Sequence, residues 1–205
     1  MKDDKKNHWE NIYTTKAVNE VSWYQAYPTT VVKYLETIQL PLDANIIDIG
    51  GGESNLVDIL LDKGYLNIWV LDISATALEK TKARLGSKAQ KVNWVVKDIT
   101  EFKPLVKFDF WYDRAVFHFL IDNDQKLLYK KVASAALNEN GHFLIGTFSE
   151  NGPLKCSGLE IQQYAEADLI AAFQDDFKVL KSFTENHSTP FNTLQNFQFC
   201  GFQKS

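Results

Sequence analysis

Short apolar runs alternate with amphipathic segments along most of this chain, and this alternation limits the folds open to it. Apolar runs cover residues 45–49, 67–72, 92–96, 108–113 and 141–148. Apolar residues at helical spacing mark segments 30–39, 53–63, 74–85 and 122–137. An alternation of strands and helices predicts a parallel sheet covered by helices on both faces, which is an α/β fold.

The last third of the chain follows a different pattern. Residues 164–173 have helical spacing, and then 177–184 and 194–202 are typical of strands with no helix between them. Parallel neighbours need a crossover of about a dozen residues or more, so these two strands are expected to pair antiparallel. We therefore predict a Rossmann-like, seven-stranded, mainly parallel sheet with a C-terminal antiparallel hairpin. One domain, 1–205, is expected, with an irregular aromatic segment over 1–28 and the core over 29–205.

A glycine-rich turn follows the first predicted strand. Gly50, Gly51 and Gly52 stand where this strand gives way to a helix, a place where glycine lets the backbone approach a ligand closely. Asp72 ends the next strand, where a carboxylate can hold both ribose hydroxyls of a nucleotide. This spacing predicts a nucleoside-containing ligand at the carboxyl edge of the sheet.

Two such ligands fit a turn of this kind, a nicotinamide dinucleotide and S-adenosylmethionine (SAM). The dinucleotide motif needs a small residue where Asn55 stands, and its pyrophosphate is disfavoured by an acidic side chain such as Glu53. SAM carries an ammonium and a sulfonium, so Asp48 and Glu53 are compatible with it. The local sequence favours SAM.

These motifs resemble those of the class I SAM-dependent methyltransferases over nearly the whole chain. The segment from Asp48 to Ser54 is similar to their first motif, although serine replaces a frequent third glycine at Ser54. The resemblance implies that SAM is the cofactor and that acidic residues ending the strands bind its ribose and adenine. The implied cofactor-binding residues are Asp48, Gly50, Gly51, Gly52, Asp72, Ile73, Asp98, Ile99 and Asp113.

The chain is also similar to a group of small bacterial methyltransferases. The similarity covers residues 8–13, 20–25, 113–120, 156–158, 187–190 and 195–197, and it is interrupted at Phe191-Asn192. This similarity implies the fold and the cofactor. It does not imply the methyl acceptor, because one fold can serve many substrates.

Three residues are candidates for catalysis. If a helix begins near Arg114, then Arg114 and His118 share one face, so that Arg114 could clamp a substrate carboxylate and His118 could act as a base. Alternatively, Arg114 pairs with an acidic neighbour and His118 packs between Phe117 and Phe119. His187, expected in the loop before the last strand, is a second candidate base or else a turn residue.

Aromatic residues precede the core. The rings of Trp9, Tyr13 and Trp23 could form a lid that covers SAM and attracts its sulfonium by cation–π contact, or they could be additional core. The first interpretation adds these three residues to the cofactor site.

The composition of the chain limits the binding partners and the cellular location that we expect for it. The net charge is −4 and the basic residues are dispersed, which argues against a nucleic-acid substrate. There is no apolar run of about 18–20 residues, no signal-type start and only two cysteines, so we expect a cytoplasmic protein without membrane contact. No spacing of His and Cys suggests a metal site. The oligomeric state is left open.

The sequence thus predicts a SAM-dependent methyltransferase that acts on a small molecule or a protein side chain. A SAM-binding module without turnover is the first alternative, and an NAD-dependent oxidoreductase is the second.

Overall fold

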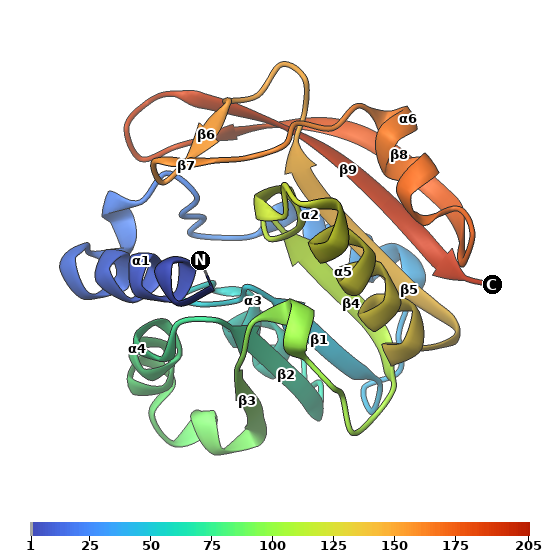
Figure 1. Ribbon diagram of the computed structural model, residues 1–205. Helices are drawn as coiled ribbons and strands as arrows, with labels where there is room; N and C mark the ends of the chain where they lie inside the picture. The colour runs from blue at the N-terminus through green and yellow to red at the C-terminus, as the bar shows by residue number, and fades with distance from the viewer. Residues whose placement is uncertain (1) are drawn as a thin grey trace.

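The computed structural model describes residues 2–205, with side chains from Asp4 onward; Met1, part of the predicted lid segment, lies outside this range. Seven strands form one sheet in the order β3-β2-β1-β4-β5-β9-β8 (Figure 1). The strands are β1 (Asn45–Ile49), β2 (Asn67–Asp72), β3 (Val92–Val96), β4 (Phe108–Arg114), β5 (Leu137–Phe148), β8 (Phe177–Ser188) and β9 (Leu194–Lys204).

The direction of the strands confirms the predicted fold class. The first five strands are mutually parallel, because β1 pairs with β2 and β4, β2 pairs with β3, and β4 pairs with β5 in that sense. β9 then runs antiparallel to β5, and β8 runs antiparallel to β9. The C-terminal hairpin therefore completes an otherwise parallel sheet.

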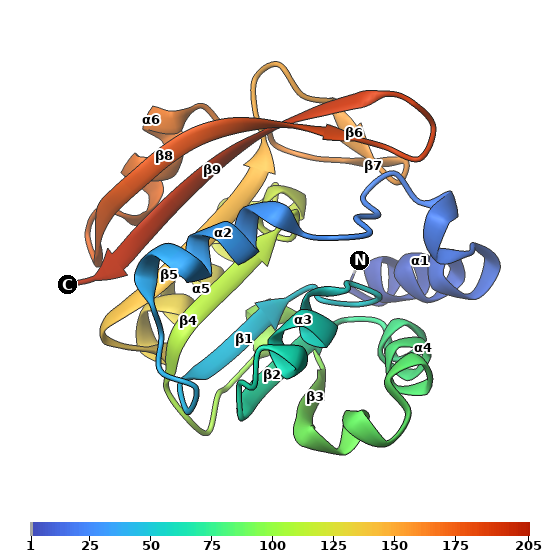
Figure 2. The same cartoon turned by 180° about the vertical axis from the view of Figure 1, so that it is seen from behind.

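Helices cover both faces of the sheet because successive strand residues point to opposite sides. Ile47 and Ile49 face α5 (Asn123–Ala136) and α6 (Glu166–Phe173) in one apolar core. Ile46 faces the other core, which includes α2 (Thr29–Ile38), α3 (Leu56–Asp62) and α4 (Ala75–Leu85). Figure 1 shows α5 in front of the sheet, and Figure 2 shows α2 and α3 on the opposite side.

The order of the strands creates a crevice at the carboxyl ends of β1 and β4. The chain builds β1, β2 and β3 outward in one direction and then returns to place β4 on the other side of β1. Open α/β sheets bind their ligands at this change of direction, outside the carboxyl ends of the strands.

The N-terminal segment differs from the prediction. Residues expected to be irregular form helix α1 (Lys2–Thr15), followed by the short 3-10 helix η1 (Val18–Glu20). This helix is largely polar, and its contacts with later parts of the chain stabilise it where its own apolar pattern would not. In both views α1 lies beside α4, at the carboxyl edge of the sheet (Figures 1 and 2).

Two further local differences affect the site. β8 continues to Ser188, so His187 lies in a strand instead of the predicted loop. Ser157 and Gly158 form the turn of a small hairpin, β6 (Lys155–Cys156) and β7 (Leu159–Glu160). Ser157 and Gly158 have φ values of 52° and 80°, as a tight two-residue hairpin turn requires. The remaining 3-10 helices are η2 (Gly86–Lys91), η3 (Ile99–Glu101) and η4 (Phe117–Phe119).

Among the helices that the described residues form, none has the length and apolar character needed to cross a membrane.

Candidate cofactor and active site

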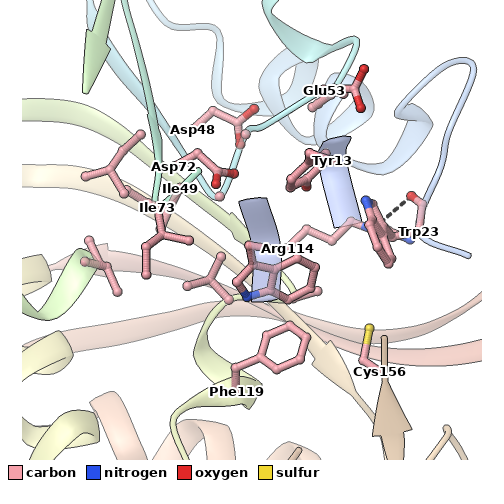
Figure 3. Close-up of a pocket in the computed structure, with 18 of the residues that line it drawn as sticks. Tyr13, Trp23, Asp48, Ile49, Glu53, Asp72, Ile73, Arg114, Phe119 and Cys156 are labelled. Carbon is pink, nitrogen blue, oxygen red and sulfur yellow. Dashed lines mark hydrogen bonds between the residues drawn. The ribbon is translucent and has the colours of Figure 1, made fainter. Parts of the chain in front are cut away.

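A cavity lies at the carboxyl ends of β1, β2 and β4, between the sheet and α1. Its wall combines residues from the glycine turn, the ends of three strands and the N-terminal segment. Figure 3 shows Asp48 and Asp72 on one side of it and Phe119 and Cys156 on the opposite side. This is the crevice that the strand order predicts as the binding site of an α/β sheet.

The glycine turn forms the floor of the cavity because side chains do not fit there. Gly50 has a φ of 68°, and a Cβ atom at this position would lie 2.2 Å from Val116 Cγ2. A Cβ atom on Gly52 would meet the Tyr13 hydroxyl at 2.8 Å and Asp72 Oδ2 at 2.9 Å. Glycine therefore lets the strand turn sharply and brings the backbone next to the acidic end of β2.

Asp48 and Asp72 provide two buried carboxyl groups at neighbouring strand ends. Asp72 Oδ1 accepts a hydrogen bond from the Ser74 N–H at 2.8 Å, and burial raises the pKa of Asp72 to about 7. Burial also raises the pKa of Asp48, helped by the nearby carboxyls of Asp113 and Asp72. Asp48 Oδ2 is buried and has no hydrogen-bond partner among the described residues. A cationic ligand would offset the cost of burying these carboxylates.

The third acidic position closes the β3 end of the cavity. Asp98 Oδ1 accepts hydrogen bonds from the Thr100 N–H at 2.8 Å and from the Thr100 hydroxyl at 2.7 Å, which begins η3. Ile73 and Ile99 line the same end of the cavity. An acidic group between apolar side chains suits a flat base with an exocyclic amino group.

Aromatic rings from the N-terminal segment cover the cavity. The Trp9 ring centroid lies 5.6 Å from that of Trp23 and 5.2 Å from that of Phe119. Tyr13 and Trp23 are 6.3 Å apart, and all four rings line the cavity. These rings can exclude water and attract a cation.

Helix α1 is attached on both sides of the cavity. On one side, the Glu10 carboxylate accepts hydrogen bonds from Ser74 Oγ at 2.9 Å, Ala75 N at 2.8 Å and Thr76 N at 3.1 Å, at the first turn of α4. On the other side, Lys5 Nζ donates to the Phe119 carbonyl at 3.0 Å. The helix thus crosses the cavity from α4 to η4.

Arg114, the last residue of β4, also lines the cavity. Its Nη1 donates to the Trp23 carbonyl at 3.1 Å, and its guanidinium carbon lies 4.3 Å from the centroid of the Phe197 ring. Its Nε and Nη2 atoms are buried and have no partner among the described residues. The alternative in which Arg114 pairs with an acidic neighbour is not supported, since no ion pair of Arg114 within 4 Å is formed in this part of the chain.

Asp113 and His118 do not reach the wall of the cavity, contrary to the roles expected for them. Asp113 points to the α5 face, where it accepts from the Tyr129 hydroxyl at 2.6 Å and from the Val116 N–H at 2.8 Å. No helix begins at Arg114, because Ala115 has a φ of 76° and turns the chain. His118 therefore leaves the face of Arg114 and enters the core.

The surroundings of His118 explain its buried position. Its Nδ1 accepts from the Phe148 N–H at 3.2 Å, and its ring lies 4.6 Å from that of Phe119. Burial, together with the nearby Arg114 charge, lowers the pKa of His118 to about 3, so the imidazole is neutral. The structure supports the alternative in which this histidine packs within the core.

His187 lies at a second hollow, beside the first. Its Nε2 is 2.8 Å from the Ser22 carbonyl oxygen, and burial lowers its pKa. Tyr24 and Gln25 line both the main cavity and this hollow, so the two adjoin. His187 holds the N-terminal segment and is outside the wall of the main cavity.

The cavity contains most of the residues predicted for cofactor binding. It is lined by Trp9, Tyr13, Trp23, Asp48, Gly50, Gly51, Asp72, Ile73, Asp98 and Ile99, whereas Gly52 and Asp113 lie behind its wall. Several lining residues were not predicted, including Lys5, Tyr112, Phe119 and Cys156. Asp48 pairs with Tyr112 in the register of β1 and β4, and strand alternation could have identified Tyr112 as a lining residue.

SAM fits this set of groups better than a dinucleotide does. Asp48 has a free buried carboxylate oxygen for an ammonium, Asp72 has the position for a ribose diol, and four aromatic rings can surround a sulfonium. At the start of α3, by contrast, a pyrophosphate would meet Glu53 in the turn and Asp58 in the first helical turn. Within residues 2–205 no group of three or more His, Cys, Asp or Glu side chains is arranged to hold a metal ion.

Comparisons with known proteins agree with this assignment. A methyltransferase domain family matches residues 47–143, from β1 to the first part of β5. The chain is 27% identical over 164 residues to malonyl-[acyl-carrier protein] O-methyltransferase 2 of Ilyobacter polytropus, covering 75% of this chain and 62% of that relative. It is 22% identical over 195 residues to EEF1A lysine methyltransferase 2 of Mus musculus, covering 86% of this chain and 72% of that relative.

Solved structures share the fold at low sequence identity. The N-methyltransferase NodS from Bradyrhizobium japonicum, in complex with S-adenosyl-L-homocysteine (SAH), superposes with a TM-score of 0.72 at 16% identity, covering 95% of this chain and 97% of that one. The chain spans about three fifths of the bacterial O-methyltransferase, 62% of its length. The matched domain identifies residues 47–143 as a methyltransferase domain, and the strand order is that of a Rossmann-like methyltransferase fold, whose cofactor is SAM.

Proposed function

We propose that this chain binds SAM in the cavity described above and transfers its methyl group to a small molecule or a protein side chain. One observation carries this proposal: Asp48, Asp72 and Asp98 line a single cavity with the glycine turn and four aromatic rings. The site therefore offers acidic groups to a cationic ligand and is partly covered by aromatic rings.

Each acidic residue has a distinct proposed role. The free oxygen of Asp48 would accept from the ammonium group, and Asp72 would accept from the ribose hydroxyls. Asp98, with Ile73 and Ile99, would hold the adenine. When bound, SAM supplies a methyl group on a positively charged sulfur. The protein then contributes alignment of the acceptor and exclusion of water, which can account for much of the rate.

The groups facing the cavity indicate which acceptors suit it. Burial raises the pKa of the Cys156 thiol to about 12 and raises that of the Tyr112 hydroxyl as well, so both stay protonated. His118 and His187 lie outside the wall of the cavity. An acceptor that is nucleophilic without losing a proton to the protein, such as a carboxylate, is favoured by this arrangement.

Helix α1 and the residues up to Pro28 are proposed to act as a lid. The helix crosses the cavity and is attached to α4 through Glu10 and to η4 through Lys5. Release of these contacts would open the cavity to the cofactor, and their return would cover it. This arrangement supports the division of the domain into a lid, 1–28, and a core, 29–205.

The acceptor class is supported by the relatives. They are named as an O-methyltransferase of malonyl-[acyl-carrier protein] and as a lysine methyltransferase of EEF1A. We propose a small-molecule or protein acceptor on this basis and on the dispersed basic charge. We also propose a cytoplasmic location, supported by Cys156 and Cys200, which are both free thiols.

Calorimetric titration with SAM, SAH and NADH tests the proposal. We expect SAM and SAH to bind in the micromolar range and NADH not to bind. Asp72→Ala should weaken SAM binding roughly 10- to 100-fold, as loss of hydrogen bonds to a charged group predicts. The control is Asp62→Ala, since Asp62 lies on the surface of α3 and pairs with Lys88 at 2.8 Å. Binding of NADH without SAM would overturn the proposal.

Turnover is tested by release of SAH during incubation with a panel of small carboxylic acids, amines and thiols. Release that depends on one acceptor class and is lost in Asp72→Ala supports a methyltransferase. SAM binding without SAH release from any of these acceptors, or from a total protein extract, would favour the alternative of a non-catalytic SAM-binding module.

A further inference from the structure

Arg114 is a partly buried cation, and its buried Nε and Nη2 atoms form an unused hydrogen-bonding edge. Only its Nη1 is engaged, by the Trp23 carbonyl at 3.1 Å, while Nε and Nη2 lack partners among the described residues. Nε and Nη2 donate in the same direction along one edge of the guanidinium, the geometry that binds both oxygens of a carboxylate. Burial lowers the pKa of Arg114, but a guanidinium keeps its proton in proteins.

No neighbouring carboxylate neutralises this charge at close range. Glu185 attracts it through space, but the Glu185 carboxylate is hydrogen-bonded to the Thr30 hydroxyl and forms no ion pair with Arg114 within 4 Å. A buried charge without a partner is costly for a fold, and an apolar residue of similar size would be less so. The placement of an arginine here indicates a ligand that supplies the missing anion.

The position of the guanidinium separates it from the proposed cofactor groups. Arg114 begins on β4 but its guanidinium lies over Phe197 on β9, beyond β5 in the sheet order. Asp48, Asp72 and Asp98 stand at the ends of β1, β2 and β3, on the other side of β4. Within the cavity Arg114 extends toward Trp23, away from the side that carries Asp48 and Asp72 (Figure 3).

We propose that Arg114 binds a carboxylate of the methyl acceptor through its free Nε and Nη2 edge. This inference rests on the proposed function, because it assigns the side of the cavity with Asp48 and Asp72 to SAM and the side with Arg114 to the acceptor. Tyr24 and Gln25 connect the cavity to the second hollow beside His187, which gives the remainder of an extended acceptor a place to lie.

The test uses hexanoate and hexanamide, which differ in charge but have the same length. The protein is first saturated with SAH, and each probe is titrated while the intrinsic tryptophan fluorescence, to which Trp9 and Trp23 in the cavity wall contribute, is followed. We expect wild type to bind hexanoate at least tenfold more tightly than hexanamide. Arg114→Met should bring this ratio close to one. Arg114→Lys should give an intermediate ratio, because lysine keeps the charge but lacks the two parallel N–H donors of the guanidinium edge. Lys178→Met removes an exposed charge on β8 and should leave the ratio unchanged.

Two results would overturn the inference. Equal binding of hexanoate and hexanamide by wild type would show that the edge does not recognise a carboxylate. The second concerns the cofactor's own carboxylate, which is present in SAH and absent from 5′-methylthioadenosine. If Arg114→Met weakens SAH tenfold and leaves methylthioadenosine unchanged, Arg114 holds the cofactor. Failure of wild type to bind SAH would instead contradict the proposed function itself.

Discussion

The attachment of α1 to α4 through Glu10 gives a prediction that separates opening of the lid from unfolding of the core. The Glu10 carboxylate accepts three hydrogen bonds from Ser74, Ala75 and Thr76, although Glu10 belongs to a different helix. Ser74 also caps α4 itself, accepting from the Ala77 N–H at 3.1 Å. Removal of Glu10 should therefore release α1 and leave α4 folded.

The size of the effect follows from the contacts. Loss of a capping side chain costs about 1 kcal/mol. The attraction of a carboxylate to a helix N-terminus adds about 0.3–1 kcal/mol. Together these contributions are about 1.3–2 kcal/mol, or roughly a 10- to 30-fold increase in the open population of the lid. Lys5 still contacts Phe119, so α1 should not detach completely.

Hydrogen exchange measured by mass spectrometry can detect this change. In Glu10→Ala, amides of residues 6–15 should exchange roughly 10- to 30-fold faster, and amides of β1 and β4 should keep their rates. SAM affinity should fall by no more than this roughly 10- to 30-fold factor, because the substitution destabilises only the closed state of the lid. The matched control is Glu79→Ala on α4, whose ion pair with Lys82 is on the surface.

Acid should have the same effect on the lid. Burial raises the pKa of Glu10, but hydrogen bonds from Thr76, Ala75 and Ser74 outweigh it, so the net pKa lies below its ordinary value. The attachment is thus present above the ordinary carboxylate pKa and lost as the pH falls through the folded-state value. Unchanged exchange of α1 in Glu10→Ala, with SAM binding intact, would refute the proposed role of Glu10 in holding the lid closed.

Three further predictions concern the core of the site. Burial raises the pKa of Asp113 in the folded state to about 7. Between about pH 4 and pH 7 the folded state therefore keeps a proton that the unfolded state releases. The free energy of unfolding should fall as the pH rises through this range. Urea unfolding should show that the free energy of unfolding differs less between pH 5 and pH 8 in Asp113→Asn than in wild type. Equal differences in the two proteins would contradict the raised pKa of Asp113. Arg114→Met should raise the free energy of unfolding of the ligand-free protein by about 1–3 kcal/mol while impairing carboxylate binding, and a loss of stability would argue against an unpaired charge. Gly50→Ala should destabilise by roughly 2–5 kcal/mol through its positive φ and the contact with Val116. Gly64→Ala is the control: φ is 89° there, but the nearest atom to a new Cβ is 3.8 Å away, so this variant measures only the free-energy cost of the positive φ.

The sheet and the acidic strand ends could be predicted because their signals are local. The apolar run before Gly50 and the carboxylate at Asp72 lie within one strand–helix–strand unit, where spacing determines position. The alternation of side chains along β4 could also have placed Asp113 opposite Tyr112 and Arg114, away from the cavity.

Other features depend on contacts that no local pattern records. His118 lies in the core because Ala115 adopts a positive φ. Alanine rarely shows this conformation, and no sequence pattern predicts it here. Helix α1 is polar, and its stability depends on partners such as Ser74 and Phe119, which are distant in sequence. The free edge of Arg114 was not foreseeable either, since it follows from which groups surround it in the folded chain.

The distance in sequence between α1 and its partners has a consequence for synthesis. Glu10 contacts Ser74 across 64 residues, Lys5 contacts Phe119 across 114, and His8 lies 3.3 Å from Ser157 across 149. Chains fold as they leave the ribosome from the N-terminus onward. The helix that is made first can therefore complete its docking only after residues up to Ser157 have been made, and its aromatic rings remain exposed to water until most of the parallel sheet exists.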